Sequence, residues 1–128
     1  LEGVVTDTHF SERARLGRLV AFLAKSEQLA GRPLLGLGVD ERAALAVEAD
    51  GRARVYSTAP GAGATVVHGG FERTQKEEHP LRIDRLWAVG VDANSVLHLP
   101  SGEVERPAFT RNYAVRDGVL VALDMPTV

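Results

Sequence analysis

The segment "TDTHFSERARLGR" (Thr6–Arg18) decides how the chain begins to fold, because a strand ends and a helix begins within it. The β-branched run "GVVT" leads into the polar residues 7–9, as in a strand that delivers side chains to a site. Ser11 fits the N-cap position, where a hydroxyl accepts a hydrogen bond from a free amide of the first turn. We therefore predict a short strand followed by a helix over about residues 12–29.

The apolar residues that follow support this helix. They recur at helical spacing and would form one buried stripe: Leu16, Leu19, Val20 and Leu23. Gly31 and Pro33 are typical of the end of a helix, so we expect the helix to stop just before them.

The first turns of this helix carry the wrong charge for their position. The three cations there are Arg13, Arg15 and Arg18, whereas the partial positive charge of a helix start favours acids. Sequences tend to break such local rules at functional sites, and guanidinium groups suit bidentate recognition of carboxylates. A solvated basic face is the ordinary alternative, but the position favours a binding role.

The remainder of the chain predicts mainly strands. "LLGLGVDE" (34–41) indicates a buried strand whose glycines allow close backbone approach. Asp50-Gly51 predicts a hairpin between two strands, and "TVVHG" (65–69) predicts another strand. An exposed loop is expected over 69–80. Three further runs, separated by turns at 92–94 and 117–118, are "RIDRLWAVG", "SVLHL" and "GVLVALD".

Composition bounds the class of protein. The 128 residues are enough for one domain with its own core, and we expect a single unbalanced α/β domain over residues 1–128. The net charge of -2 favours neither a nucleic-acid nor a membrane-surface partner. No apolar run approaches the roughly 20 residues that cross a bilayer.

Cysteine is absent, which excludes disulfides, thiolate zinc sites and a cysteine nucleophile. Because the chain starts at Leu1 and its only methionine is Met125, we expect a piece or a processed chain of a longer protein.

Three residues could form part of a catalytic site: Asp7, His9 and Glu41. A histidine acts as a general base when a carboxylate fixes its tautomer and stabilises the imidazolium, and Glu41 follows a glycine-rich strand that would hold it rigidly. Spacing alone does not force this pairing, and His9 capping a neighbouring backbone group is the alternative. A metal held by Asp7 and His9 is a weaker rival, because the other histidines are scattered.

A nucleophile is missing from this set. The elbow motif G-x-S-x-G does not occur in the 128 residues. If His9 is a catalytic base, its serine lies on another chain or segment.

Two segments together resemble cyanophycinase and its relatives, serine peptidases of the aspartyl-dipeptidase group. "DTHFSERARLGRL" (Asp7–Leu19) and "LLGLGVDERAALAVE" (Leu34–Glu48) carry the pattern Asp-x-His-Phe, Arg-x-Arg-Leu-Gly-Arg, a helix and Gly-x-Gly-x-Asp-Glu in order. The resemblance covers roughly residues 3–57. It implies the C-terminal part of a class I glutamine amidotransferase-like, flavodoxin-like sandwich, here with a β-rich C-terminal extension.

The resemblance also implies roles. His9 would be the general base, Glu41 its orienting carboxylate, and the serine would lie upstream. Five further residues would shape the substrate pocket: Asp7, Thr8, Arg13, Arg15 and Arg18. The family's substrate is a β-aspartyl-arginine unit of cyanophycin. From the charges we infer that Asp7 pairs with the substrate guanidinium and that the arginines bind its free carboxylates. No cofactor or metal is expected.

One departure from the family pattern concerns specificity. Thr8 stands where the family usually has glutamine, which leaves an aspartyl dipeptidase acting on small peptides as the first alternative. A non-catalytic domain that retains the same scaffold is a separate, second alternative. The expected partners are a companion N-terminal chain or segment with the serine and a peptide substrate; a homodimer of the assembled domain stays open. If the resemblance holds, the protein would be bacterial, and both a cytoplasmic and an exported location stay open.

Overall fold

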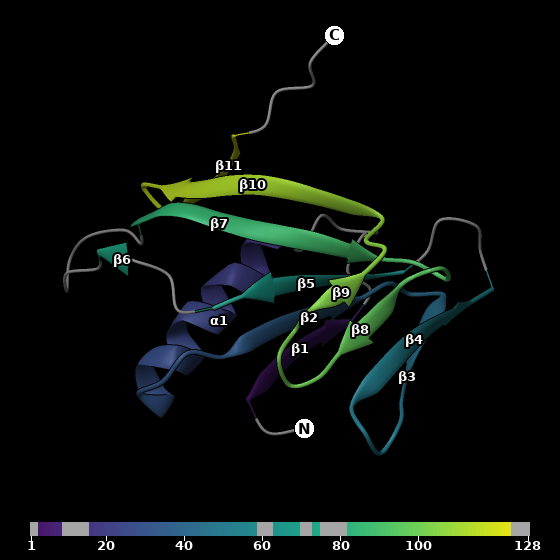
Figure 1. The fold of residues 1–128 in the computed structure, drawn as a ribbon. Helices are drawn as coiled ribbons and strands as arrows, with labels where there is room; N and C mark the ends of the chain where they lie inside the picture. The colour runs from purple at the N-terminus through teal and green to yellow at the C-terminus, as the bar shows by residue number, and fades with distance from the viewer. Residues whose placement is uncertain (1–2, 9–15, 59–62, 70–72, 75–81, 124–128) are drawn as a thin grey trace, which may run out of the picture.

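The computed structural model describes residues 3–8, 16–58, 63–69, 73–74 and 82–123, and it contains one helix and two sheets in this part of the chain (Figure 1). The elements follow in the order β1 (Val4–Thr8), α1 (Leu16–Ala30), β2 (Leu35–Val39), β3 (Ala43–Val47), β4 (Arg52–Ser57), β5 (Ala64–His68), β6 (Arg73–Thr74), β7 (Arg82–Val91), β8 (Val96–His98), β9 (Val104–Glu105), β10 (Phe109–Arg116) and β11 (Val119–Ala122).

The larger sheet is mixed. Its strand order is β1-β2-β5-β7-β10-β11, and β6 pairs with β7 beside this path. β1 and β2 run parallel, connected through α1, and the other pairs are antiparallel. The smaller sheet has the order β3-β4-β8-β9 and is antiparallel throughout. The α/β class, with one helix followed by strands, is thus confirmed for the described residues.

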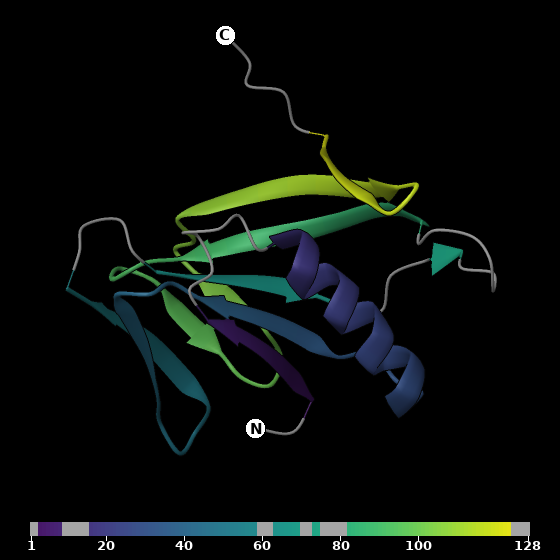
Figure 2. The ribbon, with the colours of Figure 1, turned by 180° about the vertical axis from the view of Figure 1, so that it is seen from behind.

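α1 covers one face of the larger sheet (Figure 2). Leu19 and Leu23, from the predicted stripe, are fully buried in a core that Val5 of β1 also joins. Gly36 permits the close approach: a Cβ atom there would lie 3.2 Å from Leu23 Cδ2. Gly31, at a φ of 69°, ends the helix as expected, and its amide donates a hydrogen bond of 2.8 Å to the Glu27 carbonyl.

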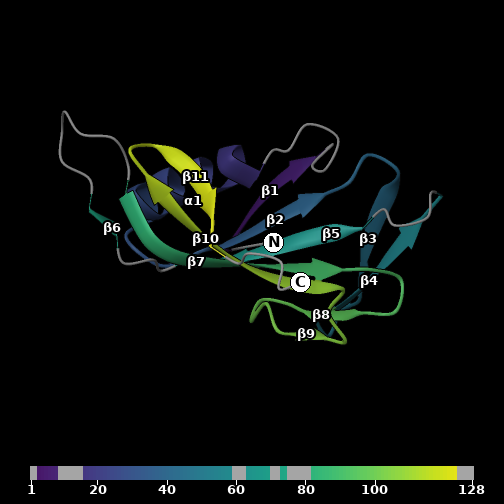
Figure 3. The same cartoon turned by 90° about the horizontal axis from the view of Figure 1, so that it is seen from above.

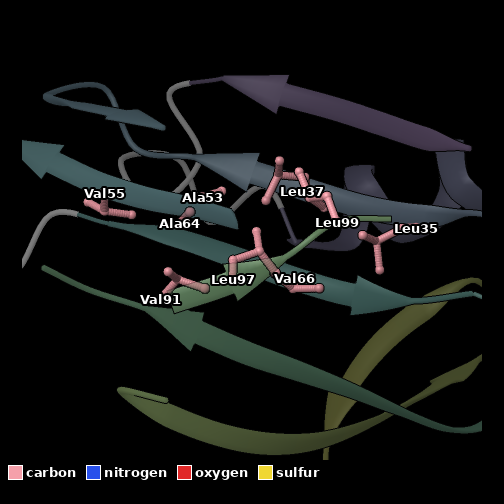
Figure 4. Packing of buried hydrophobic residues seen from close by; sticks show 9 residues of the cluster. All are labelled: Leu35, Leu37, Ala53, Val55, Ala64, Val66, Val91, Leu97 and Leu99. Carbon is pink, nitrogen blue, oxygen red and sulfur yellow. The ribbon is translucent and has the colours of Figure 1, made fainter. Parts of the chain in front are cut away.

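The smaller sheet covers the opposite face and encloses a second core (Figure 4). Its buried members come from both sheets: Leu35, Leu37, Ala53, Val55, Ala64, Val66, Val91, Leu97 and Leu99. The predicted Asp50-Gly51 hairpin joins β3 to β4, with Gly51 at a φ of 93° that favours glycine. The larger sheet therefore has hydrophobic packing on both faces around β2 and β5.

Two expectations about strands need correction. The predicted loop over 69–80 contains the short strand β6 at Arg73–Thr74, which pairs with β7. β10 was not predicted as an individual strand, although it pairs along most of β7. Burial along β10 does not alternate from residue to residue, so its sequence lacks the period-two pattern by which a half-buried strand is recognised.

Candidate functional site at the carboxyl ends of the parallel strands

The parallel pair brings two polar segments to one edge of the larger sheet. Asp7 is in register with Gly38 and Thr8 with Val39, and both strands point toward the same edge (Figure 3). His9 follows Thr8 in the sequence, and Asp40 and Glu41 follow Val39. The carboxyl ends of adjacent parallel strands are the usual location of sites in α/β folds.

Asp7 and Arg18 form an ion pair at this edge. Asp7 shares the β1 face with Val5, which packs on the α1 side, and only 7% of the residue is exposed. Arg18 Nε donates to Asp7 Oδ2 at 3.1 Å, and a second guanidinium nitrogen donates to Oδ1 at 2.5 Å. The Arg18 side chain is 45% exposed. This hydrogen bond to Asp7 raises the already high pKa of Arg18, so the guanidinium stays charged and bidentate.

The Asp7–Arg18 ion pair explains how the positive charge of Arg18 is accommodated at the helix start. Arg18 lies in the first turn of α1, and the Asp7 carboxylate supplies the negative charge that this turn otherwise lacks. The Thr8 amide also donates to Asp7 Oδ1 at 2.9 Å. The carboxylate that the sequence assigned to a substrate guanidinium therefore already holds a guanidinium of its own chain.

Glu41 lies in the turn between β2 and β3, and its side chain is exposed. Asp40, which the sequence analysis did not single out, anchors this turn to the start of β5. Its amide donates to the Gly63 carbonyl at 2.9 Å, and its Oδ2 accepts the Gly63 amide at 2.7 Å. A further bond of 3.1 Å from the Ala43 amide to the Asp40 carbonyl closes the turn. Glu41 therefore projects from a turn that is tied to two strands of the larger sheet.

The structure brings four of the seven predicted site residues to this edge: Asp7, Thr8, Arg18 and Glu41. The other three, His9, Arg13 and Arg15, lie outside the described residues. The roles assigned to all seven stay predictions. The Asp7–Arg18 pairing had one signal in the sequence, an acid that lies close to a helix start rich in arginine.

Two other histidines in the described part of the chain, His68 and His98, have hydrogen-bond partners. His68 Nε2 lies 3.1 Å from the Gly102 carbonyl oxygen, and His98 Nε2 lies 2.7 Å from Glu105 Oε2. The latter hydrogen bond lowers the pKa of the Glu105 carboxyl. Among residues 3–8, 16–58, 63–69, 73–74 and 82–123, no three histidine or acidic side chains are grouped as metal ligands would be.

An open cavity lies at the opposite end of the strands, not at the candidate edge. Its volume is about 410 Å³, and its lining includes Gly3, Arg32, Leu34 and His68. These residues lie at the amino ends of β1 and β2 and at the carboxyl end of the antiparallel β5. The cavity is therefore separated from Glu41 by the length of the strands, and we assign the candidate chemistry to the edge with the paired charges.

Comparison of the chain with protein-family models, curated proteins and solved structures found no match. Within the described part of the chain, no helix is long and apolar enough to cross a membrane.

Proposed function

We propose that this chain is the C-terminal portion of a cyanophycinase-like serine peptidase and that it supplies the triad base, His9, and acid, Glu41. The observation that carries the proposal is the register of β1 with β2, in which Thr8 lies opposite Val39. The chain segments that follow Thr8 and Val39 therefore leave the larger sheet from neighbouring positions at the carboxyl ends of β1 and β2. The β1-α1-β2 unit would belong to a class I glutamine amidotransferase-like sandwich completed by an N-terminal chain or segment.

The proposed reaction is acyl transfer to a serine outside residues 1–128. The serine hydroxyl attacks the peptide carbonyl, and its proton passes to the His9 imidazole. His9 returns the proton to the leaving amine as the C–N bond breaks, and water then hydrolyses the acyl-enzyme by the same proton path. Glu41 orients the imidazole and stabilises its charged form. This chemistry needs no cofactor.

The proposed substrate is a β-aspartyl-arginine peptide, which carries carboxylates and a guanidinium. Arg13 and Arg15 are the cations proposed to meet the substrate carboxylates by bidentate hydrogen bonds. Thr8 is exposed at the end of β1, and its short side chain in place of the family's glutamine leaves room for a different substrate. An aspartyl dipeptidase that takes small α-aspartyl peptides is therefore the second candidate.

The test starts with the native assembled protein. Intact mass and sequencing of any companion chain would show whether a serine elbow is present, and hydrolysis of a β-aspartyl-arginine polymer would be compared with that of α-aspartyl dipeptides. Preferred cleavage of the polymer supports the proposal, and preferred cleavage of the dipeptides supports the second candidate. A companion without a serine elbow, together with no cleavage of either substrate, would leave a non-catalytic domain and refute the enzyme proposal.

A further inference from the structure

We propose that the cavity at the amino ends of β1 and β2 is a binding site for a small organic carboxylate. This inference goes beyond the proposed function and does not depend on it, because it concerns binding without reaction at the end of the strands opposite Glu41. The size, the rigidity and the charge of the cavity support it.

The cavity has the size and the mixed lining of a small-molecule site. Its volume of about 410 Å³ falls within the range of about 300–1,000 Å³ that is typical of such sites. Proline and leucine side chains supply apolar surface, and three residues supply polar side chains: Arg32, His68 and Ser101. No acidic side chain is among the described residues that line it. A ligand with a short apolar body and one anionic group would match this lining.

Hydrogen bonds tie the walls of the cavity to one another. The Leu35 amide donates to the Gly3 carbonyl at 2.8 Å, which joins the wall at the start of β2 to the wall at the start of β1. The His68 ring is held against the turn after β8, since its Nε2 lies 3.1 Å from the Gly102 carbonyl oxygen. The cavity is thus formed before a ligand arrives, and a preformed site lowers the entropic cost of binding.

Arg32 supplies the positive charge of the lining. Its Nη1 would lie 3.9 Å from a Cβ atom at Gly3, so the guanidinium extends along the cavity wall. Within the described part of the chain, no carboxylate lies within ion-pair distance of Arg32. Ser101, by contrast, already donates from Oγ to the His98 carbonyl and accepts the Glu103 amide, both at 3.3 Å. The Arg32 guanidinium is therefore the group that can pair with an anionic ligand.

The chemistry of the ligand follows from these groups. A guanidinium binds a carboxylate by two parallel hydrogen bonds, and Pro33 and Pro100 would contact a short hydrocarbon body. An inorganic anion would use the charge of the cavity but not its apolar surface. The buried Glu27 carboxylate does not line the cavity, and its Oε2 accepts the Leu34 amide at 2.7 Å, so it leaves Arg32 to the ligand.

The test compares two probes of the same shape, isovalerate and its uncharged amide isovaleramide, by NMR titration of the assembled protein. Isovalerate should shift the amide signals of cavity residues such as Leu34 and Gly69 saturably. Isovaleramide should bind at least about 10-fold more weakly, because it cannot form the charge-assisted pair with Arg32. Arg32→Gln should weaken isovalerate binding by a similar factor. Arg42→Gln is the matched control, because Arg42 is exposed and lies beyond the opposite end of β2, and it should leave the affinity unchanged.

Other results would overturn the inference. It fails if isovalerate causes no saturable shift of the cavity signals, if the carboxylate and the amide bind equally well, or if Arg32→Gln binds isovalerate as tightly as the wild type. Inorganic phosphate is the third probe, and binding of phosphate tighter than that of isovalerate would indicate an inorganic anion site and refute the organic carboxylate. The titration measures no hydrolysis, so its result is independent of whether the proposed function holds.

Discussion

A carboxylate is buried at each end of the β1–β2 pair, but the two carboxylates bind different groups. At the carboxyl end, Asp7 is 7% exposed and faces a guanidinium that is itself partly open to solvent. At the amino end, Glu27 is 5% exposed and its Oε2 accepts the Leu34 backbone amide at 2.7 Å. Gly69 adjoins this carboxylate so closely that a Cβ atom there would lie 2.1 Å from Glu27 Oε2.

The carboxyl end of the strand pair therefore carries an ion pair at the solvent boundary, whereas the amino end carries a buried carboxylate bonded to the backbone. A buried carboxylate that holds a backbone amide fixes where a strand begins, since losing it would leave a polar group unsatisfied. A carboxylate paired with a guanidinium at the solvent boundary instead keeps charge close to a surface where ligands can approach. We therefore expect substitutions at the carboxyl end to change activity and those at the amino end to change stability.

The largest expected effect is on activity at the carboxyl end. Glu41→Gln should lower the hydrolysis rate of the assembled protein by about 10⁴-fold, by analogy with the orienting carboxylate of known triads. Stability should change little, because the Glu41 side chain is exposed. The measurement is kcat/KM together with thermal unfolding. Glu48→Gln is the matched control, because Glu48 is also exposed and lies just after β3, whereas Glu41 lies just before it. Equal hydrolysis rates in the two variants would contradict the role of Glu41.

The next effect is on stability at the amino end. Gly69→Ala should lower the free energy of unfolding by about 3 kcal/mol, an overpacking cost, because its Cβ would also lie 2.2 Å from the Leu34 carbonyl oxygen. Chemical denaturation measures this change. Gly31→Ala is a useful comparison, since a Cβ there meets no atom within 4 Å and its cost comes from the positive φ alone. A Gly69→Ala protein of wild-type stability would contradict the close packing.

A somewhat smaller loss is expected from Glu27→Leu. This change removes the acceptor of the partly buried Leu34 amide, and leaving such an amide unsatisfied costs about 2 kcal/mol. Glu27→Gln keeps an acceptor oxygen and should lose less. Equal stabilities of the Leu and Gln variants in denaturant unfolding would show that the hydrogen bond does not hold this end.

The smallest effect is expected at an exposed carboxylate, which serves as a reference for the two buried ones. The hydrogen bond from His98 lowers the pKa of Glu105 in the folded protein. A lowered folded pKa gives stability that is present above the ordinary glutamate value of about 4.3 and is lost as pH falls through the lowered value. The stability difference between wild type and Glu105→Gln should therefore vanish in acid, and a difference that persists there would contradict this sign.

Local signals in the sequence predicted much of the fold. The stripe of Leu19 and Leu23, the stop at Gly31 and the turn at Asp50-Gly51 all depend on neighbouring residues, and all are confirmed. β10 was not predicted, because its pairing with β7 depends on residues distant in the sequence and its burial does not alternate along the strand.

The sequence predicted several residues of the candidate site, but it did not predict the contacts between them. The sequence singled out Asp7 and Arg18 separately, whereas their pairing depends on how α1 packs against β1. The anchoring of Asp40 to Gly63 joins segments 23 residues apart, so no local pattern could have revealed it.

The central claim, that catalysis belongs to the carboxyl end, is tested most directly by comparing two histidines, one that follows β1 in the sequence and one that ends β5. His9 follows the end of β1, and His68 ends β5 beside the cavity at the other edge. In the assembled protein, His9→Ala should lower the rate of β-aspartyl-arginine hydrolysis by at least about 10⁴-fold, while His68→Ala should stay close to wild type. A His9→Ala protein with wild-type activity, or a His68→Ala protein that is equally inactive although folded, would contradict the account.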